Sequence, residues 1–279
     1  MTESFSDYSC FGDGAVGMTG HRGVLGRLLY DRLRLHGVSV VCYEGDVNDS
    51  AALREWFRLH RLHFFFHFAA IVPTARVDAD PVRAYETNVI GAFNVCREIL
   101  RSQPQCWLFH ASSSHVYRPT CDASPLAEDA ALEPQTFYGV TKLAAERVIE
   151  PLLQRMSAPY CIGRIFSFSH ATQQEPYLVP SLRRRIAEMR DGETLTVTNP
   201  SSVRDIQDAE SVVDCILRLA SKRAVGVVNI GTGVGTSVKE IAARIASELG
   251  RNIRIDGIDR DRPGSLIADT SKLQRLLSN

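Results

Sequence analysis

A tyrosine and a lysine stand four residues apart, at Tyr138 and Lys142, where the apolar spacing predicts a helix over residues 137–154. Residues four apart lie on the same face of a helix. A phenol with its ordinary pKa of about 10 is a poor base at neutral pH, but a nearby ammonium favours the phenolate and lowers that pKa. The pair could therefore exchange a proton with a sugar or steroid hydroxyl while hydride moves. Considered alone, such a pair is more often an accident of a helix surface.

Three consecutive serines, Ser112, Ser113 and Ser114, follow an apolar run that predicts a strand over residues 106–111. At the carboxyl end of a strand in an open α/β sheet, side chains point into the ligand crevice. The serines are therefore candidates for contact with a reacting group. The alternative is a serine-rich turn without chemical function.

Three glycines, Gly20, Gly23 and Gly26, recur at intervals of three between a predicted strand and a predicted helix. Glycine lets the turn tighten and lets the backbone approach a pyrophosphate, and the helix N-terminus offers free N–H groups and a positive dipole end. A plain tight turn is the alternative. In this strand–turn–helix setting the spacing favours a nucleotide-binding loop.

Around these motifs the sequence alternates short strand-like runs with longer helical stretches, as a parallel α/β sheet requires. We expect a doubly wound, mostly parallel sheet of the Rossmann type with a small C-terminal lobe packed against it. The alternation becomes irregular beyond residue 167, and Ser50 is the expected cap of the second helix. The expected strands are residues 14–19, 38–43, 63–69, 106–111, 160–166, 194–198 and 225–230, and the expected helices are residues 24–36, 50–60, 81–101, 137–154, 179–190, 209–221 and 237–249.

The composition argues against several classes of function. The chain of 279 residues carries 32 Lys+Arg and 32 Asp+Glu, so its formal net charge is zero, which argues against a nucleic-acid binder. The seven cysteines are scattered, without the spacing of a metal site or a disulfide framework, which favours reduced thiols in a cytoplasmic protein. No apolar run reaches the roughly 18–20 residues of a membrane span. Residues 1–12 lack the features of a signal peptide and are expected to be a poorly ordered leader.

The order and spacing of the three motifs resemble those of the extended short-chain dehydrogenase/reductases, which include NAD(P)-dependent sugar-nucleotide epimerases, dehydratases and reductases. The resemblance covers about residues 14–277. It implies that residues 13–166 are mainly an NAD(P)-binding domain and that residues 167–279 are mainly a substrate-binding lobe interleaved with the sheet. The motifs that carry it are the loop from Thr19 to Gly26, Gly45-Asp46-Val47, His67-Phe68-Ala69-Ala70, Asn88-Val89-Ile90-Gly91, the segment from Ser112 to Tyr117, Tyr138 with Lys142, Val203-Arg204-Asp205, and Asn229-Ile230-Gly231-Thr232-Gly233.

The resemblance implies a role for each matching residue. Tyr138 would be the acid/base, Lys142 would bind the nicotinamide ribose and lower the pKa of Tyr138, and Ser113 would bond the reacting sugar oxygen. Arg204 and Arg262 would clamp the substrate diphosphate, to which two guanidinium forks are suited. The remaining expected cofactor-binding residues are Gly20, Arg22, Gly23, Val24, Gly26 and Glu44, together with Asp46 and Val47 at the adenine and Ala69 and Ala70 along the cofactor channel. Asn88 is also expected to bind the cofactor, although it could also be a buried amide that satisfies the backbone. The remaining expected substrate-binding residues are Ser114, His115, Ser167 and Tyr177.

Several positions depart from the family's pattern. The dehydratases carry an Asp-Glu pair after the catalytic hydroxyl, where this chain has Ser114 and His115, so dehydration lacks its acid/base pair. The GDP-fucose synthases share the tetrapeptide Gly20-His21-Arg22-Gly23 but need a Cys and a His where this chain has His115 and Tyr177. Ser167 stands where many members have an asparagine. The short connection between the second strand and Asp46 resembles that of dTDP-4-dehydrorhamnose reductases.

The cofactor is expected to be NAD or NADP. Glu44 could accept a hydrogen bond from a ribose hydroxyl and would repel a 2′-phosphate, whereas Arg22 could pair with that phosphate. The identity of the tetrapeptide around Arg22 with that of the fucose synthases tips the prediction slightly toward NADP.

The favoured function is a reductase acting on a 4-keto-6-deoxy sugar nucleotide, and a sugar-nucleotide 4-epimerase is the alternative. A third interpretation is a non-catalytic, dinucleotide-sensing regulatory subunit, which would tolerate loss of the Tyr/Lys/hydroxyl set, although all three residues are present. In the family, the helices that correspond to residues 81–101 and 137–154 form a four-helix dimer interface. We therefore expect a homodimer whose partner molecule is a nucleotide sugar, with no membrane and no nucleic-acid partner and no metal.

Overall fold

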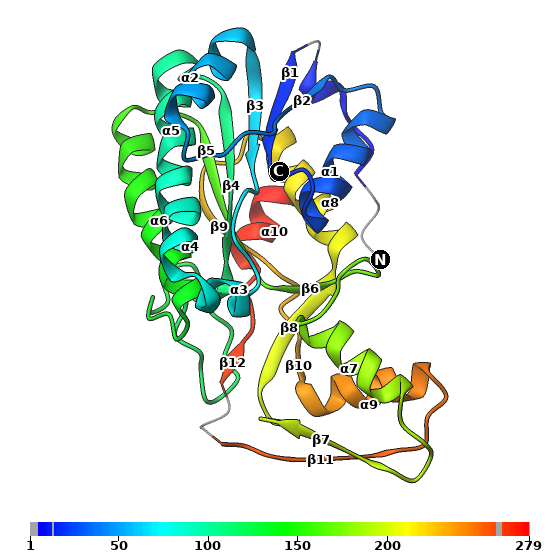
Figure 1. Ribbon diagram of the computed structural model, residues 1–279. Coiled ribbons are helices and arrows are strands. Elements are labelled where there is room, and N and C mark those ends of the chain that lie inside the picture. Colours follow the sequence, from blue (N-terminus) through cyan, green and yellow to red (C-terminus); the bar gives the residue numbers. More distant parts are fainter. Residues whose placement is uncertain (1–4, 13, 261–263, 279) are drawn as a thin grey trace.

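The computed structural model describes residues 5–12, 14–260 and 264–278 and has a six-stranded parallel sheet at its centre (Figure 1). From β1 the chain first adds β2 on one side and then crosses to the other side, so the strand order is β2, β1, β3, β4, β5, β9. This order confirms the doubly wound fold, and ligands of such sheets bind beyond the strand C-termini where the winding reverses, here between β1 and β3. The strands are β1 (Ala15–Thr19), β2 (Val40–Tyr43), β3 (Leu62–His67), β4 (Trp107–Ser113), β5 (Tyr160–Ile165) and β9 (Gly226–Ile230).

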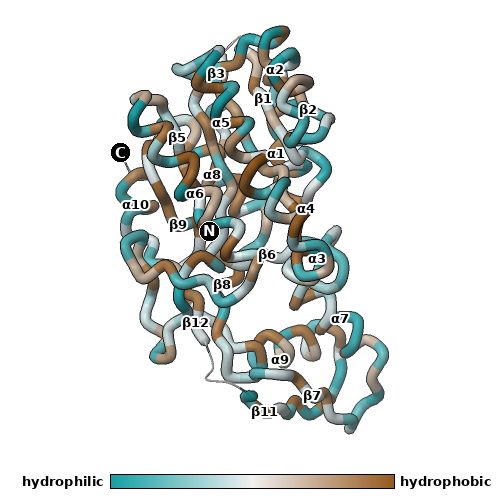
Figure 2. Tube along the Cα trace, turned by 60° about the vertical axis from the view of Figure 1, so that its left-hand side comes forward, coloured by the Kyte–Doolittle hydropathy of each residue, from teal (hydrophilic) through white to brown (hydrophobic). Residues whose placement is uncertain are grey.

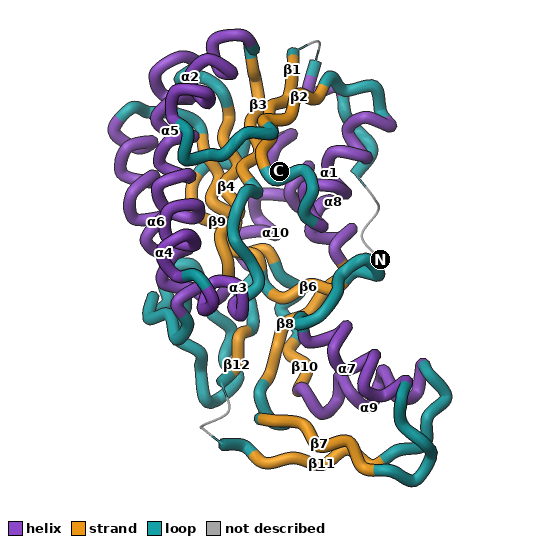
Figure 3. Tube along the Cα trace, in the orientation of Figure 1, coloured by secondary structure: helices purple, strands orange, loops and turns teal. Residues whose placement is uncertain are grey.

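Helices cover both faces of this sheet (Figure 3). One face carries α1 (Val24–Leu35), α8 (Ala209–Ser221) and α10 (Ser271–Ser278), and the other carries α2 (Ser50–Leu59), α5 (Gly91–Ser102) and α6 (Phe137–Arg155). Apolar residues at helical spacing, such as Leu25, Leu29 and Leu33, turn one side of each helix to the sheet, so hydrophobic residues follow β3, β9 and α1 in Figure 2. No helix in the described ranges is long and apolar enough to cross a membrane.

The start of α2 corrects one expectation. The carboxylate of Asp49, not the hydroxyl of Ser50, caps the helix, because it accepts hydrogen bonds from the N–H groups of Ala51 and Ala52 at 3.1 and 3.0 Å. The aspartate precedes the first helical residue, where a side-chain oxygen reaches the unpaired N–H groups of the first turn.

The helix expected over residues 81–101 is interrupted near its middle. It consists of α4 (Pro81–Tyr85), a π-helical turn (Glu86–Ile90) and α5, and a short α3 (Thr74–Ala79) precedes it. A π-helical turn inserts one residue into the helical repeat and is frequent at functional sites. Here it carries Asn88.

The N-terminal segment packs on the body of the protein, which corrects the expectation of a poorly ordered leader for its described part. A short 3₁₀ helix (Ser9–Phe11) brings Phe11 against Phe64, with ring centroids 4.9 Å apart. Tyr8 stacks on His36 at 3.9 Å. Both Tyr8 and Phe11 are buried, because aromatic side chains in an otherwise polar segment gain apolar contact with the core. Residues 1–4 lie outside the described ranges.

The later part of the chain is divided between the sheet and a second lobe. β9, α8 and α10 complete the main sheet and its helical layer, so the two parts are interleaved as expected. The second lobe lies below the sheet in Figure 1 and has its own apolar core. Its elements are β6 (Ser167–Ser169), α7 (Leu178–Ala187), β7 (Thr194–Thr198), β8 (Val203–Asp208), β10 (Gly235–Ser237), α9 (Val238–Glu248), β11 (Arg254–Ile258) and β12 (Ser265–Leu266).

The irregular pattern beyond residue 167 comes from short strands that pair across long separations. β8 pairs with β6, β10 and β12, and β7 pairs with β11 in parallel. Strands of two to six residues are too short to show a period, so of these only β7 was predicted.

Candidate active site

The glycine loop between β1 and α1 has the close backbone approach that a pyrophosphate site needs. Gly20 has a φ of +72°, and a Cβ there would lie 2.5 Å from the amide nitrogen of Ala69. A Cβ on Gly26 would collide with the carbonyl oxygen of Gly20. Helix α1 begins after Gly23, which provides no side-chain cap, so its first N–H groups are left for an anion. The loop therefore fits the diphosphate of a dinucleotide.

Arg22 and Glu44, the residues with opposite implications for the cofactor, are paired with each other. Arg22 Nη2 donates to Glu44 Oε2 at 2.8 Å, and His21 Nε2 lies 3.8 Å from Glu44 Oε1. Both members of the Arg22–Glu44 pair are exposed. The carboxylate of Glu44, which directly follows β2, thus compensates the positive charge of Arg22 that would otherwise attract a 2′-phosphate.

The other predicted cofactor residues differ in their exposure to solvent and in their contacts. Ala69 and Ala70, directly after β3, and Val24, in the first turn of α1, are partly exposed next to the glycine loop. Asp46 accepts a hydrogen bond from Arg83 at 2.6 Å. The side chain of Val47 is buried in the core, so its contact with adenine stays a prediction.

Asn88 is a buried amide whose polar atoms are engaged. Its Oδ1 accepts from the N–H of Ile71 at 2.7 Å, and its Nδ2 donates to the carbonyl of Ile71 at 3.3 Å and to Thr141 Oγ1 at 3.0 Å. The interpretation as a backbone-satisfying amide is confirmed. Because Thr141 adjoins Lys142, Asn88 joins the segment after β3 to the helix that carries the predicted acid/base.

Ser113, Tyr138 and Lys142 come together from the end of β4 and the first turns of α6. Burial raises the pKa of Tyr138 to about 12, while a hydrogen bond with Ser113 acts in the opposite direction. The pKa of the phenol is therefore raised in this structure, and not lowered by the ammonium as expected, because burial dominates. A phenol in this state is protonated at neutral pH and is suited to donate a proton.

Lys142 is buried, and its Nζ donates to the carbonyl of Ala111 at 2.8 Å. Burial lowers the pKa of Lys142 to about 8, and the carboxylate of Glu146 raises it in part. His67 and His110 face this region from β3 and β4, with ring centroids 5.3 Å apart. Burial and the ammonium lower the pKa of His67 to about 3, so this imidazole is neutral at neutral pH.

On the substrate side, the ring of His115 lies edge-on to that of Tyr138, with centroids 5.6 Å apart. Burial and the nearby Arg204 lower the pKa of His115 to about 4, which leaves it neutral. Arg204 Nη1 donates to the carbonyls of Val203 and Gly264 at 2.8 and 2.9 Å. No carboxylate of the described residues forms an ion pair with Arg204, which leaves its charge available to an anion.

The remaining predicted substrate residues differ in access. Ser114 is buried, whereas Ser167, at the start of β6, and Tyr177, at the N-terminus of α7, are partly exposed. The phenol of Tyr177 acts electrostatically on Tyr138, so α7 of the second lobe approaches the predicted acid/base. Arg262 lies outside the described residues.

Two charged residues near the site were not predicted. Glu146 lies one helical turn after Lys142, and the interval of four residues was the signal that could have identified it. Arg76 of α3 acts electrostatically on Tyr177 from across the crevice, and no sequence pattern marks it.

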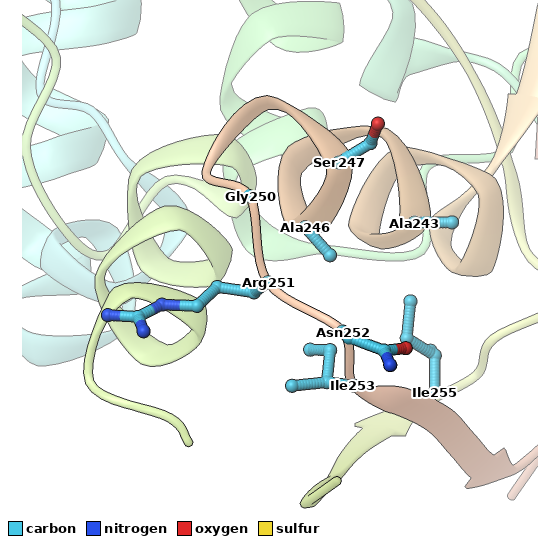
Figure 4. A pocket seen from close by; sticks show the side chains of 8 residues that line it. All are labelled: Ala243, Ala246, Ser247, Gly250, Arg251, Asn252, Ile253 and Ile255. Atoms are coloured by element: carbon cyan, nitrogen blue, oxygen red, sulfur yellow. The ribbon is translucent and has the colours of Figure 1, made fainter. Parts of the chain in front are cut away.

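A separate hollow of about 400 Å³ lies in the second lobe between α9 and β11 (Figure 4). Arg251 donates to the carbonyl of Ala187, and none of the lining residues belongs to the predicted site. The lining residues are Ala243, Ala246, Ser247, Gly250, Arg251, Asn252, Ile253 and Ile255. Within the described ranges no group of three or more His, Cys, Asp or Glu side chains could hold a metal ion.

A sequence model of the family described as GDP-mannose 4,6-dehydratase matches residues 23–275. The chain belongs to this family. Its members include extended short-chain dehydrogenase/reductases, so this protein is an NAD(P)-dependent enzyme of the sugar-nucleotide epimerase, dehydratase and reductase group.

Individual relatives carry epimerase and reductase names. The chain is 27% identical to a UDP-glucose 4-epimerase of Rhizobium leguminosarum bv. trifolii over 254 residues, which cover 84% of this chain and 77% of that protein. It is 26% identical to a GDP-6-deoxy-D-mannose reductase of Pseudomonas aeruginosa over 185 residues, which cover 64% and 61%. The solved structure of MoeE5 in complex with UDP-glucose and NAD is similar at 26% identity, with a TM-score of 0.80 and coverage of 95% and 92%.

Proposed function

We propose that this member of the GDP-mannose 4,6-dehydratase family is a 4-epimerase of a nucleotide-linked sugar and that it retains NAD. The observation that carries the reaction class is the placement of Ser113, Tyr138 and Lys142 beside a loop that fits a dinucleotide diphosphate. The positions after Ser113 hold Ser114 and His115, without a carboxylate for dehydration. The chemistry is then limited to hydride and proton exchange at one carbon.

The chain's own residues account for the proton at that carbon. When bound, a nicotinamide supplies or takes up the hydride. As the hydride leaves carbon 4, the phenolate of Tyr138 takes the proton of the hydroxyl on that carbon, and as the hydride returns, Tyr138 donates this proton back to the same oxygen, to which Ser113 hydrogen-bonds. The ammonium of Lys142 stabilises the phenolate when it forms.

The arrangement around Arg22 and Arg204 supports the cofactor and the substrate class. Glu44 carries a negative charge to the place where NADP has its 2′-phosphate, which favours NAD over the slight sequence-based preference for NADP. Arg204 has a guanidinium that is half-buried and free of described carboxylates, which suits the diphosphate of a nucleotide sugar.

The reductase remains the second candidate, and the tetrapeptide Gly20-His21-Arg22-Gly23 with the similarity to GDP-6-deoxy-D-mannose reductase favours it. The preference for the epimerase depends on Glu44 and on the epimerase names among the relatives. The two functions make different demands on the cofactor, since an epimerase regenerates it in each cycle and a reductase must release it.

The test is therefore cofactor retention with substrate conversion. Denatured protein should release near-stoichiometric NAD. Among UDP-, GDP-, dTDP- and CDP-linked sugars, at least one should be interconverted with its 4-epimer without a net change in NADH absorbance. Tyr138→Phe should lower turnover about 10²–10⁴-fold and leave cofactor content unchanged. Stoichiometric oxidation of added NAD(P)H by a 4-keto sugar nucleotide would establish the reductase instead.

We also propose a homodimer through the outer faces of α4 and α6. Apolar side chains there are exposed, among them Val82 at 69%, and a hollow of about 300 Å³ lies between the two elements. The lining residues are Pro81, Val82, Tyr85, Glu86 and Phe137. Sedimentation equilibrium should give twice the mass of 30.9 kDa, and Val82→Glu should shift it toward the monomer. A monomeric wild-type chain at micromolar concentration would exclude this interface.

A further inference from the structure

Glu146 is a buried carboxylate at the centre of a polar network that joins β4, β5 and α6. Its side chain is 2% exposed and lies one turn after Lys142 on α6. Arg164 of β5 donates to it through Nε at 3.2 Å to each oxygen and through Nη2 at 2.8 Å to Oε2. The hydroxyl of Ser112 also donates to Glu146. The carboxylate is therefore compensated in charge and saturated with donors.

The same network holds both ends of the segment that contains Ser113. At one end, Ser112 is bonded to Glu146. At the other end, the hydroxyl of Tyr117 accepts from Arg164 Nη1 at 2.9 Å and donates to Asn229 Oδ1 at 2.7 Å. Because Glu146 belongs to the helix that carries Tyr138 and Lys142, one ion pair joins the serine segment to the catalytic helix.

Glu146 also determines the charge balance around Lys142. The titratable groups that interact electrostatically with the ammonium are Glu146 on α6, His67 on β3 and His110 on β4. Burial lowers the pKa of both histidines, so they are neutral and do not compensate the ammonium. Glu146 is the carboxylate in this set, and it opposes the effect of burial on Lys142.

We propose that Glu146, fixed by Arg164, is a positioning residue that holds the segment of Ser113 against the catalytic helix and places a buried negative charge one helical turn from Lys142. The carboxylate touches neither substrate nor cofactor and acts through Lys142 and Ser112. The inference rests on the proposed function for the role of Lys142 in the reaction, but the protonation of Lys142 can be measured without any substrate.

The chain contains only four lysines, at positions 142, 222, 239 and 272, so their titration can be followed individually. With lysine labelled by ¹³C at Cε, the NMR spectrum of the cofactor-loaded enzyme has four signals, and Lys142→Arg identifies that of Lys142. Glu146→Gln keeps the size and removes the charge, and should move the midpoint of Lys142 down by about one pH unit or more. The alkaline limb of kcat should move with it if the proposed function holds.

Glu98→Gln is the matched control, because Glu98 is a buried helical carboxylate of α5 with arginine neighbours, Arg54 and Arg97, and belongs to no part of the site. It should leave the Lys142 midpoint unchanged. If Glu146→Gln fails to fold, Glu146→Asp is used, and it should keep the midpoint near the wild-type value while kcat falls.

An unchanged Lys142 midpoint in Glu146→Gln, or a lowered midpoint in Glu146→Asp, would overturn the inference. If no sugar nucleotide is converted by the wild-type enzyme, the proposed function fails while the NMR titration still decides the role of Glu146. If the wild-type enzyme converts a sugar nucleotide and the titration midpoint of Lys142 does not move in Glu146→Gln, only the inference about Glu146 fails.

Discussion

Two arginine–glutamate pairs in this molecule have the same distance and opposite surroundings. In each pair an Nη2–Oε2 contact measures 2.8 Å. The side chains of Arg164 and Glu146 are 4% and 2% exposed, whereas those of Arg22 and Glu44 are 75% and 63% exposed. The first pair lies below the catalytic residues, and the second lies on the outer side of the glycine loop.

The difference shows that burial, and not the contact distance, decides what an ion pair does. Water screens the exposed pair, so it contributes little to stability and its members can exchange partners when a ligand arrives. The buried pair has lost its hydration, so neither charge can be left alone without a large cost. An exposed pair such as Arg22–Glu44 can select a cofactor, while a buried pair such as Arg164–Glu146 can fix the geometry of a reaction.

Breaking the buried pair should have the largest effect. Arg164→Met leaves the carboxylate of Glu146 buried without its countercharge and should lower the free energy of unfolding by about 3–5 kcal/mol. Urea denaturation at neutral pH, followed by circular dichroism, measures the change.

The exposed pair supplies the comparison for this experiment. Arg22→Ala should change the free energy of unfolding by less than about 1 kcal/mol. Replacing both buried partners, as in Glu146→Leu with Arg164→Met, should recover most of the lost stability without restoring turnover. Equal destabilisation by Arg164→Met and Arg22→Ala would show that burial does not distinguish the two pairs.

Breaking the exposed pair should have a smaller effect, which is seen in cofactor preference. Glu44→Gln removes the charge that repels a 2′-phosphate and frees Arg22, so NADP should bind about tenfold more tightly relative to NAD. Isothermal titration calorimetry of the cofactor-free protein with each dinucleotide gives the ratio.

Arg22→Ala should act in the opposite direction and weaken NADP without affecting NAD. If both variants leave the ratio of the two affinities unchanged, the Arg22–Glu44 pair does not discriminate between the cofactors.

The local part of the site was predictable because its signals are local. The spacing of Gly20, Gly23 and Gly26 is a property of one turn, and Tyr138 and Lys142 share one helix face whatever surrounds the helix. The alternation of apolar runs likewise predicted the strands of the main sheet, since its inner strands are buried on both faces. The short strands of the second lobe gave no such signal, because their stability comes from partners far along the chain.

The sequence by itself therefore determined the doubly wound fold and pointed to the glycine loop and to the residues that we propose exchange the proton. The tertiary structure alone decided how those residues are charged. It brought Arg164 from β5 to Glu146 on α6, and Arg22 to Glu44 across the loop. It also partly desolvated Tyr138 and buried Lys142, so that their pKa values move to about 12 and about 8. The physical reason is that desolvation and ion pairing depend on which atoms surround a charge, and those atoms come from segments that the fold alone brings together.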